Sequence, residues 1–176
     1  MLVVDEAYWR FIFPPETHSA VELLETASRS HIILLRSLTK DFALAGLRLG
    51  YAITTTHVAE LLSAQLPSWN VSEIAQAAGI AALNDRLHLK TTLDKLTIER
   101  QVFFHALRDS GLNVLSSRTH FCLIEVGDAQ HVRKQLLTRK ILVRDCTSFG
   151  LPQFIRVATR PTNEWQQLLL ALQEII

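Results

Sequence analysis

Short apolar runs alternate with longer segments of helical spacing over the first half of the chain. Residues 2–4 and 31–35 are apolar on both faces, as the central strands of a parallel sheet are, and residues 49–53 form a third run of strand length. The segments with helical spacing are residues 20–27, 56–66 and 72–84. This alternation predicts an α/β arrangement, in which helices cover a sheet.

The first apolar run lies unusually close to the start of the chain. Its sequence predicts a fully buried strand, which is unusual at this place because chain ends normally lie at the surface and fray. Asp5 and Glu6 follow this run directly, at the strand end where open α/β sheets bind their ligands. We therefore expect the chain to be the later part of a larger α/β protein.

The hydrophobic pattern changes in the second half of the chain. Residues 87–109 carry apolar positions at helical spacing, and Gly111 supplies a stop signal for that helix. The segments that follow are predicted strands at residues 114–115, 121–126, 141–143 and 154–158, and predicted helices at 129–139 and 163–176. This order predicts a small α+β domain. We place the domain division in the long helix, with domains at residues 1–87 and 88–176.

Composition and charge narrow the class of protein. Eighteen Lys and Arg against 17 Asp and Glu give a net charge of +1, which argues against an electrostatic nucleic-acid binder. The hydrophobic content of 48% is that of a chain that folds, yet no apolar run reaches the ~18 residues of a membrane span. Cys122 and Cys146 lie far apart without ligand-like spacing, so no metal site or disulfide is predicted. We expect a soluble, cytoplasmic protein.

Hydroxyl and basic side chains follow the second apolar run. Ser37, Thr39 and Lys40 come directly after it, and Arg48 lies eight residues beyond the lysine. Short hydroxyl donors and a guanidinium suit a phosphate group. An amine among apolar neighbours suits Schiff-base chemistry, because desolvation disfavours its charged form. The same spacing is equally typical of a solvated loop lysine.

Asp5 and Tyr8 form a second candidate pair, three residues apart after the first strand. A carboxylate and a phenol at this spacing could contact one heteroaromatic ring, the first at a ring nitrogen and the second at a ring oxygen. Taken alone, the pattern is also that of a strand-ending acid beside a packed aromatic residue.

Three motifs together carry a family resemblance. They are Val-Val-Asp-Glu-Ala-Tyr at residues 3–8, Arg-Ser-Leu-Thr-Lys at 36–40 and Leu-Ala-Gly-Leu-Arg-Leu-Gly-Tyr at 44–51. With them the chain resembles the fold-type I pyridoxal-phosphate enzymes, class I/II aminotransferases, in the branch of histidinol-phosphate aminotransferase and threonine-phosphate decarboxylase. The resemblance implies that residues 1–87 are the C-terminal part of the large cofactor-binding domain, with a mostly parallel sheet and helices. Residues 88–176 would then be its small α+β domain.

The resemblance also implies a role for each motif residue. Lys40 matches the lysine that forms the Schiff base with pyridoxal 5'-phosphate, Asp5 the acid that pairs with the pyridinium nitrogen, and Tyr8 the phenol on the ring hydroxyl. The residues that match the phosphate-binding set are Ser37, Thr39 and Arg48.

Two arginines in the second half match the family's substrate contacts. Arg144 matches an arginine that contacts a phosphate on the substrate, and Arg156 matches one that clamps the substrate α-carboxylate. A bidentate contact between a guanidinium and a carboxylate orients the substrate as well as attracting it. Without the resemblance, surface ion pairing would explain both arginines.

Several family elements have no counterpart in this sequence. The glycine-rich turn, the aromatic residue stacked on the cofactor and an asparagine near the ring hydroxyl all precede the Asp-x-x-Tyr element in the family. We therefore interpret the chain as the C-terminal half of the enzyme, with part of the cofactor site, and expect it to be incomplete as an isolated enzyme.

Three functions follow as hypotheses. The first is an aminotransferase acting on an amino acid or a phosphorylated amino compound such as histidinol phosphate. The second is a threonine-phosphate decarboxylase of cobamide biosynthesis, which the Arg-Ser-Leu-Thr-Lys motif favours. The third is a truncated, non-catalytic remnant. The expected partner is a small-molecule amino acid or amino-phosphate substrate, without nucleic acid or membrane, and the full-length form is expected to be a homodimer.

Overall fold

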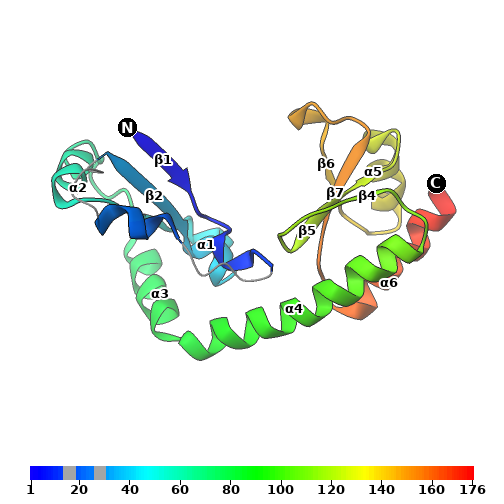
Figure 1. Cartoon of the computed structure of the whole chain (residues 1–176), viewed down its shortest axis with the longest axis horizontal. Coiled ribbons are helices and arrows are strands. Elements are labelled where there is room, and N and C mark those ends of the chain that lie inside the picture. Colours follow the sequence, from blue (N-terminus) through cyan, green and yellow to red (C-terminus); the bar gives the residue numbers. More distant parts are fainter. Residues whose placement is uncertain (14–18, 26–30) are drawn as a thin grey trace. The chain divides into compact units, whose positions relative to one another are not determined.

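The computed structural model describes residues 1–13, 19–25 and 31–176. The chain forms two compact units, Met1–Thr92 and Leu93–Ile176, and each has its own sheet (Figure 1). The first sheet has the strand order β1-β2-β3, and the second has the order β4-β5-β7-β6. Within the described ranges, no helix is both long and apolar enough to cross a membrane.

The first sheet combines one parallel and one antiparallel pairing. Its strands are β1 (Leu2–Asp5), β2 (Ile32–Ser37) and β3 (Gly50–Ile53). β1 runs parallel to β2, and β3 runs antiparallel to it. β2 is the central strand and its Leu34 is fully buried, as the apolar sequence predicts.

The expectation that the first strand is buried is wrong. Leu2 and Val3 in β1 are 53% and 55% exposed. Among the described residues β1 pairs with β2 alone, so it is an edge strand with one unpaired side. A doubly apolar sequence is typical of a central strand, but burial requires neighbours that this sheet does not provide.

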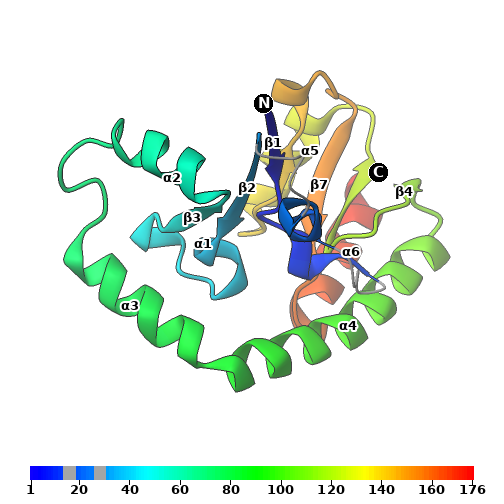
Figure 2. The same cartoon turned by 60° about the vertical axis from the view of Figure 1, so that its left-hand side comes forward.

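Helices follow the strands of the first unit (Figure 2). They are η1 (Trp9–Phe11), η2 (Ala20–Glu25), α1 (Leu38–Asp41), η3 (Ala45–Leu47), α2 (Thr56–Ser63) and α3 (Glu73–Asn84). The helix predicted at residues 20–27 is a 3₁₀ helix that ends at Glu25, and residues 26 and 27 lie outside the described part. α3 begins where Ser72 accepts a hydrogen bond from the Ala75 N–H (3.2 Å), a standard N-cap.

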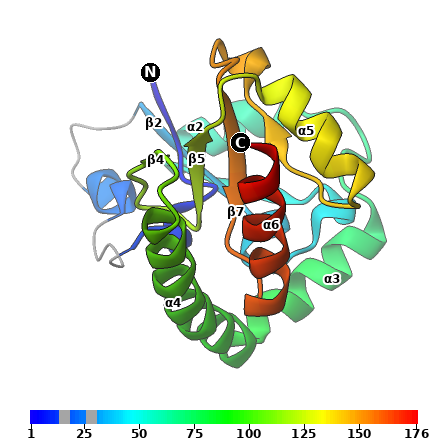
Figure 3. The ribbon, with the colours of Figure 1, turned by 90° about the vertical axis from the view of Figure 1, so that its right-hand side faces the viewer.

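The second unit combines a four-stranded antiparallel sheet with helices. Its strands are β4 (Val114–Leu115), β5 (Phe121–Glu125), β6 (Arg144–Asp145) and β7 (Phe154–Ala158). Its helices are the end of α4 (Arg86–Asp109), α5 (Ala129–Thr138), η4 (Thr147–Phe149) and α6 (Thr162–Ile175). α5 and α6 can be followed beside the sheet in Figure 3.

The strand predicted at residues 141–143 lies further along the chain, at Arg144–Asp145. The Ile141 N–H instead donates to the Leu136 carbonyl oxygen (2.9 Å) and closes the turn after α5. Val143 is buried in the core and Ile141 packs against it. The apolar run therefore reflects packing rather than strand pairing.

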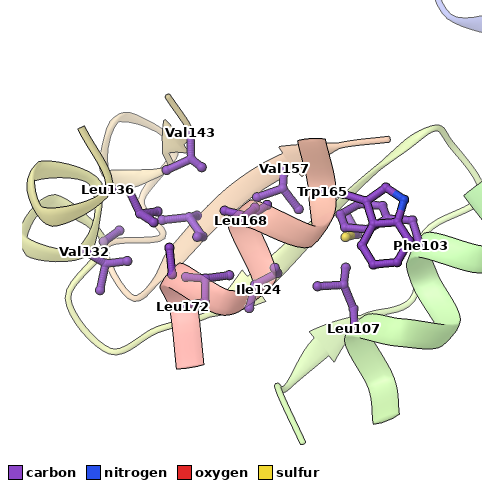
Figure 4. Packing of buried hydrophobic residues seen from close by; sticks show 14 of the residues in the cluster. Phe103, Leu107, Ile124, Val132, Leu136, Val143, Val157, Trp165, Leu168 and Leu172 are labelled. Atoms are coloured by element: carbon purple, nitrogen blue, oxygen red, sulfur yellow. The ribbon is translucent and has the colours of Figure 1, made fainter. Parts of the chain in front are cut away.

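One hydrophobic core holds the second unit together (Figure 4). Ile124 of β5 and Ile155 of β7 are direct cross-strand neighbours, and both are fully buried. Phe103 of α4 lies against Trp165 of α6, with ring centroids 5.8 Å apart. Leu136 brings α5 into the same cluster, so α4, α5 and α6 cover the same face of the sheet.

Candidate functional site

The first candidate site lies at the carboxyl ends of β1 and β2. Their parallel pairing aligns Asp5 with Leu35, and the Glu6 N–H extends the pairing by donating to the Leu35 carbonyl oxygen (2.9 Å). Asp5 and Ser37 therefore end neighbouring strands at the same edge of the sheet. This is the edge where α/β sheets carry ligand-binding residues.

Lys40 and Tyr8 lie together at this edge. α1 begins directly after β2 and carries Lys40, while Tyr8 immediately precedes η1. The Lys40 Nζ atom is 5.3 Å from the centroid of the Tyr8 ring. Lys40 is exposed, so its amine is accessible to a ligand. The structure thus brings two of the sequence-predicted site residues into contact.

The remaining candidate cofactor residues are only partly assembled. The Ser37 and Thr39 hydroxyls are hydrogen-bonded to each other (2.7 Å). Arg48 adopts a left-handed backbone conformation (φ 52°), and its guanidinium donates to the Ala45 carbonyl oxygen (2.9 Å) rather than to the two hydroxyls. Asp5 accepts a hydrogen bond from the Ala7 N–H (2.9 Å), which fixes its carboxylate beside the strand end.

Sequence reasoning missed a buried ion pair beside these residues. Glu6 and Arg36 are 2.6 Å apart, and each side chain is only 8% exposed. Ser19 donates to Glu6 (2.9 Å) and accepts from Arg36 Nη2 (2.8 Å), while the Ala20 N–H donates to Glu6 (2.8 Å). The sequence does place Glu6 and Arg36 next to motif residues on two strands of the same predicted sheet. Whether the two side chains meet depends on the strand register, which the sequence does not state.

A second ion pair joins the same two chain segments. Arg10 donates to the Asp41 carboxylate (3.2 Å), which links the η1 segment to α1. Burial raises the pKa of the Asp41 carboxyl above its usual value, and the attraction of Arg10 opposes this effect.

The second candidate site lies in the second unit. Arg144 of β6 and Arg156 of β7 line a cavity of about 390 Å³ together with Lys140 and Arg160. Glu164, the carboxylate in its lining, is bound to Arg160 (2.8 Å). The cavity therefore carries an excess of positive charge and suits an anionic ligand.

The two candidate substrate arginines are held by neutral groups. Arg144 donates to the Ser148 hydroxyl (2.7 Å) and lies 5.1 Å from the Phe149 ring centroid. Arg156 lies 5.0 Å from the Phe121 ring centroid. Within the described residues neither guanidinium forms an ion pair with a carboxylate, so both charges are available to a substrate.

Asp145 adjoins Arg144 but projects from the opposite face of β6. Arg144 pairs with Arg156 and Asp145 pairs with Ile155, and successive residues of a strand alternate between faces. Hydrogen bonds from the Thr147 hydroxyl (2.6 Å) and N–H (2.8 Å) lower the pKa of Asp145. In the parts of the chain that the structure describes, no group of three or more His, Cys, Asp or Glu residues could hold a metal ion.

Comparison with known proteins identifies the family. A family model described as "Aminotransferase class I and II" matches residues 1–173. The chain belongs to this family. Over 176 residues it is 33% identical to a histidinol-phosphate aminotransferase of Caldicellulosiruptor saccharolyticus, covering 99% of this chain and 49% of that protein. The family predicted from the sequence motifs is therefore confirmed.

Solved structures show that the fold extends over the same residues. The histidinol-phosphate aminotransferase of Sinorhizobium meliloti, in complex with pyridoxal-5'-phosphate, matches with a TM-score of 0.81 and 30% identity, over 99% of this chain and 48% of that chain. L-threonine-O-3-phosphate decarboxylase of Porphyromonas gingivalis matches in fold with a TM-score of 0.84 and 24% identity, over 98% of this chain and 54% of that chain. The predicted α/β transferase fold is confirmed, and the chain spans about half the length of the curated relatives it matches.

Proposed function

We propose that this chain contributes the lysine-bearing part of a pyridoxal-phosphate-dependent aminotransferase that acts on a phosphorylated amino compound, as histidinol-phosphate aminotransferases do. The observation that carries the proposal is the contact between the accessible Lys40 amine and the Tyr8 ring at the carboxyl edge of two parallel strands. The similarity to a pyridoxal-phosphate complex at 30% identity supports it.

The side chains at this edge fit the polar groups of the cofactor. Lys40 offers an amine, Asp5 a carboxylate at the strand end, and Tyr8 a phenol. Ser37 and Thr39 offer two adjacent hydroxyls, 2.7 Å apart, which suit phosphate oxygens. When bound, pyridoxal phosphate supplies an aldehyde that condenses with a primary amine, releasing water, and a ring that withdraws electrons from a bond at the substrate α-carbon.

Each candidate cofactor residue then has a defined task. Lys40 Nζ provides the amine to which the cofactor aldehyde would attach, and it would then move the proton at the substrate α-carbon. Asp5 holds a proton on the ring nitrogen through its carboxylate, and Tyr8 donates a hydrogen bond to the ring oxygen. Ser37, Thr39 and Arg48 bind the phosphate; Arg48 would have to exchange its bond to Ala45 for this contact.

The substrate is held by the arginines of the second unit. Arg156 binds the α-carboxylate of an amino-acid substrate such as glutamate, and Arg144 binds the phosphate of a phosphorylated substrate, as two guanidiniums without carboxylate partners can. A fixed orientation decides which bond at the α-carbon is weakened, so these two contacts select the reaction.

The apolar surface of α3 supports a homodimeric full-length protein. Ile74, Ile80 and Leu83 are 75%, 64% and 51% exposed, and apolar surface of this kind is typical of an interface. Sedimentation of the full-length protein tests the dimer, and a monomer would contradict it.

Covalent labelling tests the role of Lys40. Incubation with pyridoxal phosphate, borohydride reduction and peptide mapping are expected to place the pyridoxyl group on Lys40. The Lys40→Arg variant is expected to lose the label, whereas Lys90→Arg, which changes an exposed lysine in α4, is expected to keep it. Labelling at Lys90 or Lys95 instead of Lys40 would overturn the assignment.

Product analysis of the full-length protein separates the alternative functions. An aminotransferase forms glutamate from 2-oxoglutarate and histidinol phosphate. A decarboxylase instead releases carbon dioxide from threonine phosphate. If neither glutamate nor carbon dioxide forms and Lys40 stays unlabelled, the protein is a non-catalytic remnant.

A further inference from the structure

The Glu6–Arg36 ion pair joins the two segments that carry the candidate cofactor residues. β1 and β2 run parallel with Asp5 aligned to Leu35. The residues that follow these two, Glu6 and Arg36, form the ion pair. Glu6 is the residue after Asp5, and the residue after Arg36 is Ser37. The pair therefore lies between the segment that ends in Tyr8 and the segment that leads to Lys40.

The two charges are almost completely removed from water. Each side chain is 8% exposed, and the closest nitrogen and oxygen atoms are 2.6 Å apart. Ser19 bridges the pair, since its hydroxyl donates to Glu6 and accepts from Arg36. The Arg36 guanidinium also lies 4.4 Å from the centroid of the Trp9 ring, within the range of a cation–π contact.

Stability alone does not explain this arrangement. A buried ion pair is often no more stabilising than apolar side chains of similar volume, because both charges lose their hydration. The Arg36 Nε atom is also buried without a hydrogen-bond partner among the described residues, which adds a cost. The hydrogen bonds that the pair makes with Ser19 and the Ala20 N–H are directional, so they favour one geometry between the two backbone segments.

A second contact constrains the same two segments. Arg10, two residues beyond Tyr8, donates to Asp41, the residue after Lys40 (3.2 Å). Glu6 and Arg10 lie on either side of Tyr8 in the sequence. Their partners, Arg36 and Asp41, lie on either side of Lys40. Lys40 and Tyr8 lie between these two links, where Nζ is 5.3 Å from the ring centroid.

We propose that Glu6 and Arg36 are positioning residues, whose ion pair holds the Asp5–Tyr8 segment against the Ser37–Lys40 segment and so keeps the Lys40 amine beside Tyr8. This inference rests on the proposed function of Lys40. Each acts by positioning the segment that carries the cofactor-site side chains.

A double variant separates positioning from stability. Glu6→Leu with Arg36→Met removes both charges, keeps the approximate volume and leaves no unpaired charge behind. The control is Arg139→Met with Glu174→Leu, which removes an ion pair (3.1 Å) from the second unit. Both double variants are expected to unfold near the temperature at which the unmodified protein unfolds.

The first measurement needs no cofactor. Amide hydrogen exchange is expected to become at least roughly tenfold faster at residues 5–9 and 37–41 in the Glu6–Arg36 double variant and to stay unchanged in the control. Exchange at residues 32–36 of β2 and across β3 is expected to keep its protection. Unchanged exchange at residues 5–9 and 37–41 would overturn the proposal, and so would loss of protection throughout residues 1–92, which would indicate a purely structural role.

The second measurement uses pyridoxal phosphate itself. The concentration that gives half-maximal borohydride-trapped label on Lys40 is expected to rise roughly tenfold or more in the Glu6–Arg36 double variant, because small displacements of a reacting group are costly. Equal half-saturation in the double variant and the unmodified protein would overturn the positioning role. If the unmodified protein carries no label on Lys40, the proposed function fails, and the exchange measurement still decides whether the pair links the two segments.

Discussion

Arg144 and Arg156 are direct cross-strand neighbours, the only charged pair opposed in the described β6–β7 ladder. Residues opposed in this way project from the same face of a sheet, and both arginines line the same cavity of about 390 Å³. Two like charges placed together are unfavourable unless an anion offsets them. Their arrangement fits anionic ligand groups, such as the carboxylate of an amino-acid substrate and the phosphate of a phosphorylated one.

Substitution of each arginine is expected to affect different substrates. In the full-length protein, Arg156→Ala should impair every amino-acid substrate, because the carboxylate loses its partner. Arg144→Ala should impair phosphorylated substrates selectively. Loss of one charged hydrogen-bond partner costs on the order of 1.5–3 kcal/mol, roughly a ten- to hundredfold loss in kcat/KM.

The matched control for the arginines is Lys134→Ala, which removes an exposed cation from α5 outside the cavity. Its kcat/KM values are expected to stay close to those of the unmodified protein. Equal losses for phosphorylated and unphosphorylated substrates in Arg144→Ala would contradict the division of roles.

Gly50 is expected to tolerate no side chain. A Cβ atom at this position would lie 2.8 Å from the backbone carbonyl oxygen of Arg36, so β2 or β3 would have to shift. Gly50→Ala should therefore cost roughly 1–3 kcal/mol of unfolding free energy, as overpacking does. Because Gly50 pairs with Ser37, the same variant should also weaken cofactor binding. Denaturant titration and borohydride trapping measure the two effects.

Gly46→Ala provides the control for Gly50. Nothing lies within 4 Å of a Cβ atom at Gly46, so its unfolding free energy is expected to change by less than about 0.5 kcal/mol. Equal destabilisation by the two substitutions would show that the close approach to Arg36 does not constrain the sheet.

Local sequence signals predicted the longer helices closely, whereas the helix expected at residues 56–66 is α2, Thr56–Ser63, and ends three residues earlier. The helix expected at residues 87–109 is α4, Arg86–Asp109, and the one expected at 72–84 begins directly after the cap residue Ser72. Periodicity and capping depend on residues three or four positions apart, so they can be read from the sequence. The motifs likewise identified Lys40 and Tyr8, which the fold brings together.

Features that depend on distant segments could not be read in this way. The exposure of Leu2 and Val3 follows from the number of strands that pair with β1, which no local pattern states. The Glu6–Arg36 pair requires the parallel register of two strands that are far apart in sequence. The catalytic and binding roles of Lys40 and the other motif residues remain predictions until labelling tests them.

The two cysteines are expected to be inert in the folded protein. Cys122 and Cys146 are each 1% exposed, and burial raises the pKa of the Cys122 thiol to about 12, against the opposing attraction of Arg100. The thiolate is the reactive form, so a thiol reagent at pH 8 should label neither cysteine until denaturant is added. Rapid labelling of the native protein would contradict this expectation.

The raised pKa of Cys122 also makes stability depend on pH. An unfolded thiol titrates near pH 9, so the folded state retains its proton more strongly between pH 9 and about 12. The contribution of Cys122 is therefore fully present below pH 9 and is lost as the pH rises toward 12. Unfolding free energies measured by denaturant titration from pH 8 to 11 should fall less steeply in Cys122→Ala, and identical slopes would contradict the assignment.

The second unit is expected to fold without the first. Its buried core runs from Phe103 to Leu172 and lies wholly within residues 93–176, so a fragment of that length keeps every core contact. Within it, Leu136 is fully buried and Leu137 is 49% exposed. Leu136→Ala should cost about 2–5 kcal/mol because it leaves a cavity, whereas Leu137→Ala should cost far less. Circular dichroism during denaturant titration of the fragment measures both; an unfolded fragment, or equal losses at the two leucines, would show that the core needs the first unit.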